Sequence, residues 1–191
     1  KKKIFISCGG SNLIELKNTI KFLENKNVIL MHGFQSYPTS IKDVNFQKLK
    51  ILMNYFGRKF DYGYQDHTSG SSKFNFYLPL ISMGIGVNYI EKHVTLNRKK
   101  KGVDYFSSIE PRKLKQFIDV VRNSELALIG GQDWFSKNEI KYREEVKKNW
   151  IVKKNLKKKD KLKLNDVEML RHPEKGTYPL NFNRYNNREI I

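Results

Sequence analysis

Short apolar runs alternate with helical patterns over the first two thirds of the chain. The runs predict strands at 3–7, 28–32, 60–64 and 87–93, of which 60–64 is the most polar. Between and after these runs, apolar residues recur three or four positions apart, which predicts helices over 13–23, 46–56 and 72–84 and another that begins at 111. Alternating strands and helices are typical of a parallel sheet with helices on its outside.

Local signals mark the starts of these helices. Asn12, with Glu15 three residues later, has the spacing of a capping box. Pro111 stands where a helix begins, a position at which the missing N–H of proline removes no helical hydrogen bond. Pro79 lies inside the mostly apolar stretch 72–84, so we expect it either to bend that helix or to mark its true start.

Two architectures fit four strand–helix units of this kind: a doubly wound sheet and part of a (β/α)8 barrel. A whole barrel takes about 250 residues, so four units would make half of one. The turn after the first strand, residues 8–11, reads Cys-Gly-Gly-Ser and lacks the glycine pattern of dinucleotide-binding folds. A dinucleotide site is therefore disfavoured, while both architectures stay open at this point.

The character of the chain changes after residue 129. Gly130 and Gly131 interrupt it, a charged stretch with helical character follows at 136–148, and short alternating segments at 149–170 predict a small β-rich unit. Residues 178–191 add little to a core. We therefore expect a partial barrel over 1–130, a linker over 131–148 and an incomplete β-rich domain over 149–191.

The net charge is +18, and lysines gather in the second half of the chain, for example at 99–101, 147–148, 153–154 and 157–159. Such an excess invites a nucleic-acid-binding interpretation. No zinc-finger spacing, RNA-reading aromatic motif or evident helix-turn-helix accompanies these lysines. A solvated basic surface, a nucleic-acid face and a site for a small anionic ligand all stay open, and the lack of a motif favours the first.

Composition narrows the class of protein further. Hydrophobic residues at 39% suffice to bury a core, and no apolar run approaches the ~18 residues of a membrane-spanning helix. A single cysteine, Cys8, excludes a disulfide framework within the chain, and we expect a reducing, cytoplasmic location. The sequence begins without Met, so we expect it to be part of a longer protein.

Polar side chains follow the ends of the predicted strands, where ligands bind in parallel α/β folds. His67 and His93 follow adjacent strands, and each has an acid nearby, Asp66 and Glu91 respectively. Two imidazoles beside a carboxylate suit a divalent first-row metal ion. The sequence thus predicts a metal site at His67 and His93, whereas His32, at the end of the second strand, is interpreted as structural.

Four segments at these strand ends resemble the N-acetylneuraminate synthase family, also called sialic acid synthases. HGFQSYPT (32–39) is similar to the family's HC-x-x-x-YPT, and GYQDHTSG (63–70) to its GYSDHT-x-G. IEKHVTLNRKKKGVDY (90–105) and SSIEP (107–111) are similar to IEKHFTLDR with G-x-DH and to a SLEP-like stretch. LRHPEKG (170–176) resembles the KRPG-x-G of the family's small C-terminal antifreeze-like domain.

The resemblance implies a fold and a reaction. The fold would be α/β: the second half of a (β/α)8 TIM barrel, a linker and an incomplete antifreeze-like, β-clip domain. Family members are transferases that condense phosphoenolpyruvate with an N-acylated amino-sugar aldehyde, such as N-acetylmannosamine, to give a nine-carbon 2-keto sugar acid and phosphate. A divalent ion, manganese or magnesium, polarises the aldehyde. Intact members form domain-swapped homodimers, and we expect the 191-residue chain alone to be inactive.

By motif position, the resemblance also implies roles for single residues. His67 and His93 would be the metal ligands and, together with Asp104, the catalytic residues. Arg171 stands where the antifreeze-like domain sends an arginine into the active site of the partner subunit. A guanidinium suits a hydroxyl-rich or anionic ligand because its donors form a fixed fork.

The substrate-binding positions implied by the resemblance lie on three strand ends. Ser7 and Gln35 would contact phosphoenolpyruvate, and Tyr37 and Asp104 would contact the sugar. Gln65, which stands where the family has Ser, could hydrogen-bond a substrate carboxylate.

Other positions depart from the family pattern, and two further hypotheses stay open. Gly33 replaces Cys, Asn97 replaces Asp, and Tyr105 replaces the His that follows Asp104. One alternative is a split or degenerate homologue that binds metal or sugar without catalysis. The other, less favoured because no motif supports it, is a basic nucleic-acid-binding protein.

Overall fold

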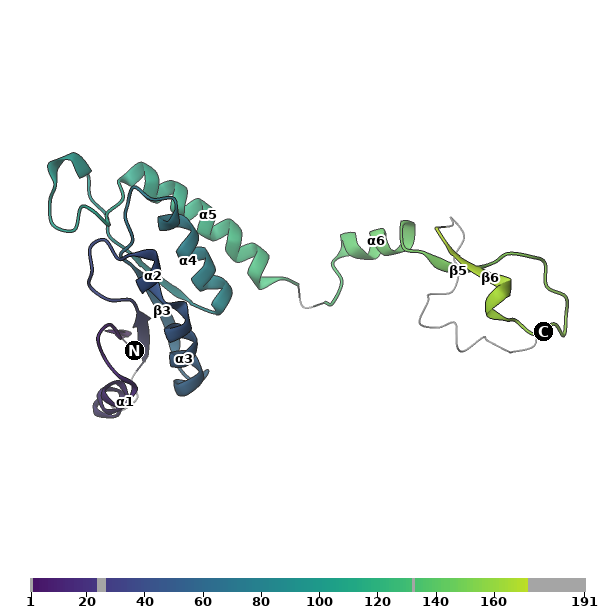
Figure 1. Ribbon diagram of the computed structural model, residues 1–191, viewed down its shortest axis with the longest axis horizontal. Helices are drawn as coiled ribbons and strands as arrows, with labels where there is room; N and C mark the ends of the chain where they lie inside the picture. Colours follow the sequence, from purple (N-terminus) through teal and green to yellow (C-terminus); the bar gives the residue numbers. More distant parts are fainter. Residues whose placement is uncertain (1, 24–26, 132, 172–191) are drawn as a thin grey trace. The chain divides into compact units, whose positions relative to one another are not determined.

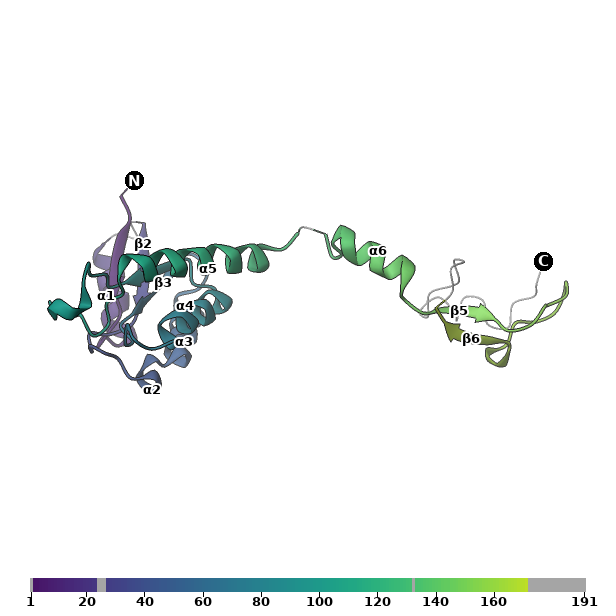
Figure 2. The same cartoon turned by 90° about the horizontal axis from the view of Figure 1, so that it is seen from above.

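A computed structural model describes residues 2–23, 27–131 and 133–171 (Figures 1 and 2). The chain divides into two compact units, residues 1–130 and 131–191. Among the described residues, no helix combines the length and the apolar character that crossing a membrane requires.

The first unit is built on a parallel sheet of four strands in the order β1-β2-β3-β4. The strands are β1 (Ile4–Ser7), β2 (Val28–His32), β3 (Asp61–Asp66) and β4 (Tyr89–Lys92). All four predicted strands are therefore confirmed, although β3 runs two residues further than its apolar pattern indicates. Because the strands are parallel, their carboxyl ends lie at the same edge of the sheet.

Helices cover the outer face of this sheet. They are α1 (Leu13–Phe22), α2 (Ile41–Val44), α3 (Phe46–Phe56), α4 (Phe74–Ile85) and α5 (Pro111–Ile129). The capping box of Asn12 and Glu15 is present, and Pro111 occupies the first turn of α5. Helices α4 and α5 lie side by side in both views (Figures 1 and 2). The ring centroids of Phe76 on α4 and Phe117 on α5 are 5.6 Å apart.

The core of the first unit lies between the sheet and the helices. One cluster joins Leu16 of α1, Leu30 of β2 and Leu52 of α3. A second cluster joins Leu49 of α3 with Tyr64 of β3 and with residues of α4. Alternate residues of the strands thus face the helices, which leaves the other set on the inner face of the sheet.

The sheet curls strongly toward its inner face. The rings of Phe5 on β1 and Tyr89 on β4 are 5.4 Å apart, although these are the first and last strands, and Lys3 donates a hydrogen bond to the Tyr89 hydroxyl. Gly63 leaves room for Met31, because a Cβ at this glycine would lie 2.1 Å from the Met31 sulfur. The unit is therefore an α/β half-barrel of four parallel strands, and the doubly wound alternative is set aside.

A buried ion pair ties β3, β4 and α4 together. Lys92 Nζ lies 2.5 Å from Asp66 Oδ2, and the two side chains are 5% and 0% exposed. Lys92 also donates to the carbonyl oxygen of Asn75 at 3.0 Å. Pro79, four residues after Asn75, has no N–H for that carbonyl, so the ammonium group replaces the missing helical bond. Pro79 therefore neither starts nor ends α4, which runs through it.

Within its described residues, the second unit has a helix and a two-stranded sheet. Helix α6 (Lys137–Glu145) begins with a capping box at Ser136. Strands β5 (Asn149–Val152) and β6 (Val167–Leu170) pair in antiparallel fashion over a small cluster of Leu162 and Val167. The expected antifreeze-like domain stays a prediction, because most of the KRPG-like segment, together with the rest of 172–191, lies outside the described residues.

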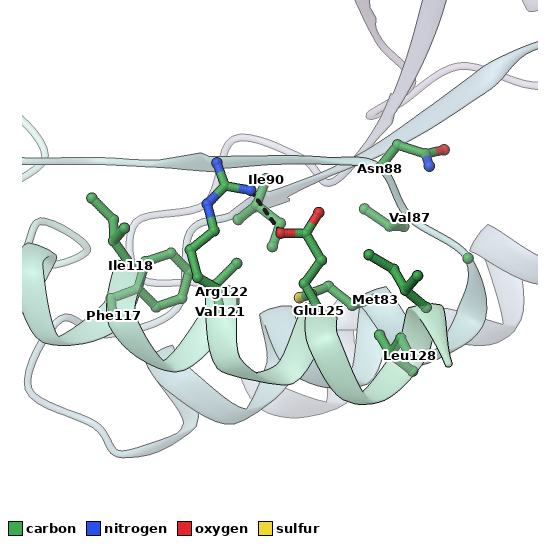
Figure 3. Close-up of a pocket in the computed structure, with 12 residues that line it drawn as sticks. Met83, Val87, Asn88, Ile90, Phe117, Ile118, Val121, Arg122, Glu125 and Leu128 are labelled. Carbon is green, nitrogen blue, oxygen red and sulfur yellow. Dashed lines mark hydrogen bonds and ion pairs between the residues drawn. The ribbon is translucent and has the colours of Figure 1, made fainter. Parts of the chain in front are cut away.

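A pocket of about 420 Å³ opens between the end of α4, the start of β4 and α5 (Figure 3). Val87 and Asn88, which precede β4, line it, and the ion pair of Arg122 and Glu125, 2.9 Å long, lies beside them. It therefore sits at the amino end of β4, away from the carboxyl ends of the strands. Leu128 of α5, which lines it, is 54% exposed.

The buried pair predicts a large loss of stability in Lys92→Met, because this change leaves Asp66 buried without its cationic partner. Breaking a buried pair typically costs about 3–5 kcal/mol. Urea denaturation should show a fall of that size in the free energy of unfolding, against little change for Lys115→Met, which alters an exposed lysine of α5. Adding Asp66→Asn to Lys92→Met should recover much of the loss. A double variant no more stable than Lys92→Met would contradict the pairing.

Candidate functional site

The two histidines that the sequence singles out meet at the carboxyl edge of the sheet. His67 follows β3, His93 follows β4, and their ring centroids are 5.0 Å apart. The ring of Tyr37 packs against both, at 4.9 Å from His67 and 5.1 Å from His93. The backbone of His67 is fixed by two hydrogen bonds to its carbonyl oxygen, from Thr39 N at 2.8 Å and Ser107 Oγ at 2.7 Å.

Strand register explains why these side chains converge. Gln65 pairs with Glu91, and Asp66 pairs with Lys92, in the ladder between β3 and β4. Side chains alternate between the two faces of a strand, so Asp66 and Lys92 point to the helices while Gln65 and Glu91 point inward. His67 is the next inward residue after Gln65 along the chain. The buried ion pair thus fixes the register that brings the inward residues together.

Glu91 completes a possible ligand set with the two histidines. One ligand atom from each of His67, Glu91 and His93 lies within 4.8 Å of the others. His67 Nε2 is 3.7 Å from Glu91 Oε1. The neighbouring His67 imidazole holds the pKa of Glu91 below its ordinary value, against the opposing effect of burial. Two imidazoles and one carboxylate are a common donor set for divalent first-row metals.

The tautomer of His67 suits a cation between it and Glu91. Its Nδ1 lies 2.7 Å from the carbonyl oxygen of Phe34, which can only accept, so Nδ1 carries the proton. In the neutral ring, the Nε2 lone pair then faces a carboxylate oxygen. Burial lowers the pKa of His67, but its contacts with Glu91 and with the Phe34 carbonyl outweigh burial and hold the pKa above its ordinary value. The surroundings of Nε2 therefore favour a positive charge, whether a proton or a metal ion.

Asp104 lies beside the ring of His93. The Nδ1 atom of this ring lies 3.6 Å from Asp104 Oδ2. Burial, and next the neighbouring His67, lower the pKa of His93 despite this carboxylate. The carbonyl of Asp104 accepts hydrogen bonds from the backbone of Ser107 and Ser108, which fixes the loop. A carboxylate behind a ligating histidine is the arrangement that orients such rings in metal sites.

Of the other strand-end residues that the structure describes, Ser7 and Gln65 are linked to this cluster by hydrogen bonds, whereas Gln35 is not. Ser7 of β1 donates to the side chain of Gln65 at 2.9 Å, and Gln65 donates in turn to Glu91. Gln35 is exposed, and no hydrogen bond or ring contact joins it to the cluster within the described part of the chain. Arg171 is an exposed residue of the second unit. Its proposed contact with a partner subunit stays a prediction.

Sequence spacing alone does not show to which face of the sheet Asp66, Glu91 and His32 point. Asp66, next to His67 in sequence, faces the helices and belongs to the ion pair, so it is not the acid of the candidate metal site. Glu91 is that acid, and the signal for it is strand alternation, because it lies two residues before His93 on the same face. His32 is 4% exposed and contacts the carbonyl of Val44 at 2.7 Å, as a structural histidine does.

Comparisons with known proteins show which family the chain is related to. The chain is 33% identical to the N,N'-diacetyllegionaminic acid synthase of Campylobacter jejuni over 153 residues, which covers 78% of the chain and 44% of that protein. It is 29% identical to the N-acetylneuraminate-9-phosphate synthase of Drosophila melanogaster over 129 residues, 66% of the chain and 33% of that protein. The chain thus spans less than half the length of these curated relatives.

A solved structure and a family model extend the comparison. The structure of N-acetylneuraminic acid (sialic acid) synthetase from Leptospira borgpetersenii, in complex with citrate, superposes with a TM-score of 0.60 at 26% identity, covering 74% of the chain and 49% of that protein. The model of the NeuB family matches residues 1–133, which include the whole half-barrel and every member of the histidine cluster. The chain therefore belongs to the NeuB family, the family of sialic-acid-type synthases.

Proposed function

We propose that the intact protein condenses phosphoenolpyruvate with an N-acylated amino-sugar aldehyde, such as N-acetylmannosamine. The observation that carries the proposal is the cluster of His67, Glu91 and His93 at the carboxyl edge of a NeuB-family half-barrel. In the reaction, C3 of phosphoenolpyruvate bonds to the aldehyde carbon and the aldehyde oxygen takes a proton. Water adds at C2 and phosphate leaves, which gives a nine-carbon 2-keto sugar acid.

The donor set fits a divalent ion, manganese or magnesium. His67 would bind it through Nε2, whose lone pair already faces Glu91, and His93 would bind it from the neighbouring strand. Such an ion would polarise the carbonyl of the sugar aldehyde. Asp104, whose carboxylate lies 3.6 Å from His93 Nδ1, would orient that ring when the ion is bound.

The remaining residues would orient the two substrates. Burial, followed by the charges of Asp104 and Glu91, raises the pKa of Tyr37, so its hydroxyl stays protonated at neutral pH and can donate to a sugar oxygen. The Asp104 carboxylate can accept from sugar hydroxyls. Ser7 and Gln35 remain the proposed contacts of phosphoenolpyruvate.

Three further features of the proposal concern the whole protein. Because the curated relatives are more than twice as long as the matched segment, the complete active site is proposed for the intact protein, which would act in the cytoplasm. The intact protein would be a homodimer, in which Arg171 reaches the site of the partner. The 191-residue chain alone would have little or no activity.

The first test is the reaction itself. Intact protein, incubated with phosphoenolpyruvate, Mn²⁺ and a panel of N-acylated amino-sugar aldehydes, should release phosphate in an aldehyde-dependent manner, and mass spectrometry should find the nine-carbon keto acid. His93→Ala should lower the rate of both products at least a hundredfold. Metal binding without product, across a panel that includes N-acetylmannosamine and related N-acylated aldehydes, would favour the non-catalytic homologue instead.

The second test concerns the ligand set. Titration of the intact protein with Mn²⁺, followed by electron paramagnetic resonance, should show one tight site. His67→Ala, His93→Ala and Glu91→Gln should each weaken it at least tenfold, because each removes a donor atom. Glu125→Gln, which neutralises a carboxylate at the other end of β4, should bind as the wild type does. Equal affinity in all four variants would contradict the assignment.

The third test concerns Arg171. Losing a bidentate arginine contact typically costs ~1.5–3 kcal/mol. Arg171→Ala should therefore raise the KM of the sugar about tenfold or more and leave the KM of phosphoenolpyruvate nearly unchanged in the intact dimer. Arg171→Lys should restore part of the loss, since an ammonium group lacks the fork. Unchanged sugar kinetics in Arg171→Ala would mean that Arg171 is a surface residue with no part in sugar binding.

A further inference from the structure

Gln65 links three strands through its carboxamide group. Its Oε1 accepts from Ser7 Oγ of β1 at 2.9 Å, and its Nε2 lies 3.2 Å and 3.3 Å from the two carboxylate oxygens of Glu91 on β4. The side chain is 8% exposed. Both ends of the carboxamide are therefore occupied by protein groups, which leaves it few free positions for a substrate atom.

The orientation of this carboxamide follows from the chemistry of its partners. An ionised carboxylate only accepts hydrogen bonds, so Gln65 must turn its NH₂ group toward Glu91. Its carbonyl oxygen then faces Ser7, whose hydroxyl can donate. The arrangement satisfies all three side chains and leaves the negative charge of Glu91 in place, because Gln65 is neutral.

Gly33 lies against the backbone and the Cβ of Gln65. Its φ of 146° lies in a region open essentially to glycine, and a Cβ there would lie 2.7 Å from the carbonyl oxygen and 2.8 Å from the Cβ of Gln65. The two residues that depart here from the family pattern, Gly33 in place of Cys and Gln65 in place of Ser, are thus in contact with each other. A serine side chain at 65 is two atoms shorter than the carboxamide and could not span Ser7 and Glu91 together.

We propose that Gln65 is a positioning residue, which holds the Glu91 carboxylate toward His67 for metal binding, rather than a substrate contact. Glu91 is 45% exposed at its side chain, and its carboxylate would otherwise rotate freely. Contact with both oxygens restricts that rotation. The inference rests on the metal site of the proposed function, but it does not depend on which sugar is used.

Mn²⁺ affinity of the intact protein, measured without substrates, tests this role. Gln65→Met keeps the length of the side chain and removes both hydrogen bonds, so it should weaken Mn²⁺ binding about 10- to 100-fold, the range for lost outer-shell partners. In a Glu91→Gln background the same change should have almost no further effect. Gln116→Met, at an exposed glutamine of α5, is the matched control and should bind normally.

Each result decides between positioning and the alternatives. Gln65→Asn keeps the carboxamide on a side chain that is one methylene shorter, so it should lose part of the Mn²⁺ affinity. This variant replaces Gln65→Met in the test if Gln65→Met does not fold. Wild-type affinity in both variants, or an equal loss in the Glu91→Gln background, would overturn the positioning role. A wild-type protein that binds no Mn²⁺ would overturn this inference together with the metal site. Tight Mn²⁺ binding without condensation would overturn the proposed reaction alone.

Discussion

The candidate site depends on the buried ion pair between Lys92 and Asp66. The pair joins β3 to β4 in one register, and the carbonyl that Pro79 leaves without a helical partner anchors Lys92 to α4 as well. A slip of one residue would turn every inward side chain of these strands toward the helices. Both side chains of the pair point to the helices, away from the inner face of the sheet. The pair determines that Glu91 and the histidines face the inside of the half-barrel.

Electrostatics on the inner face give a physical reason for a metal ion. Glu91 and Asp104 place two carboxylates beside the histidines, each within 3.7 Å of an imidazole nitrogen. Phosphoenolpyruvate, the proposed substrate, is itself an anion and would be repelled by these charges. A divalent cation among the three donors would offset the carboxylates and attract the substrate.

The sequence alone predicts the strands, most of the helices and the proximity of His67 to His93, because these features follow from periodicity, capping and strand order. The sequence did not show which of Glu91 and Asp66 belongs to the candidate metal site. Both are acids near a histidine, and only the strand register shows which side chain points to the inner face of the sheet. The reach of Gln65 across β2 and the partner of the Asn75 carbonyl depend on tertiary contacts.

The central claim is that His67, Glu91 and His93 hold one divalent ion. Anomalous diffraction from manganese-soaked crystals of the intact protein tests it most directly. The account predicts a single strong peak about 2.0–2.3 Å from an imidazole nitrogen of each histidine and from a Glu91 oxygen. A manganese ion bound elsewhere, with the two rings turned to different faces of the sheet, would contradict it.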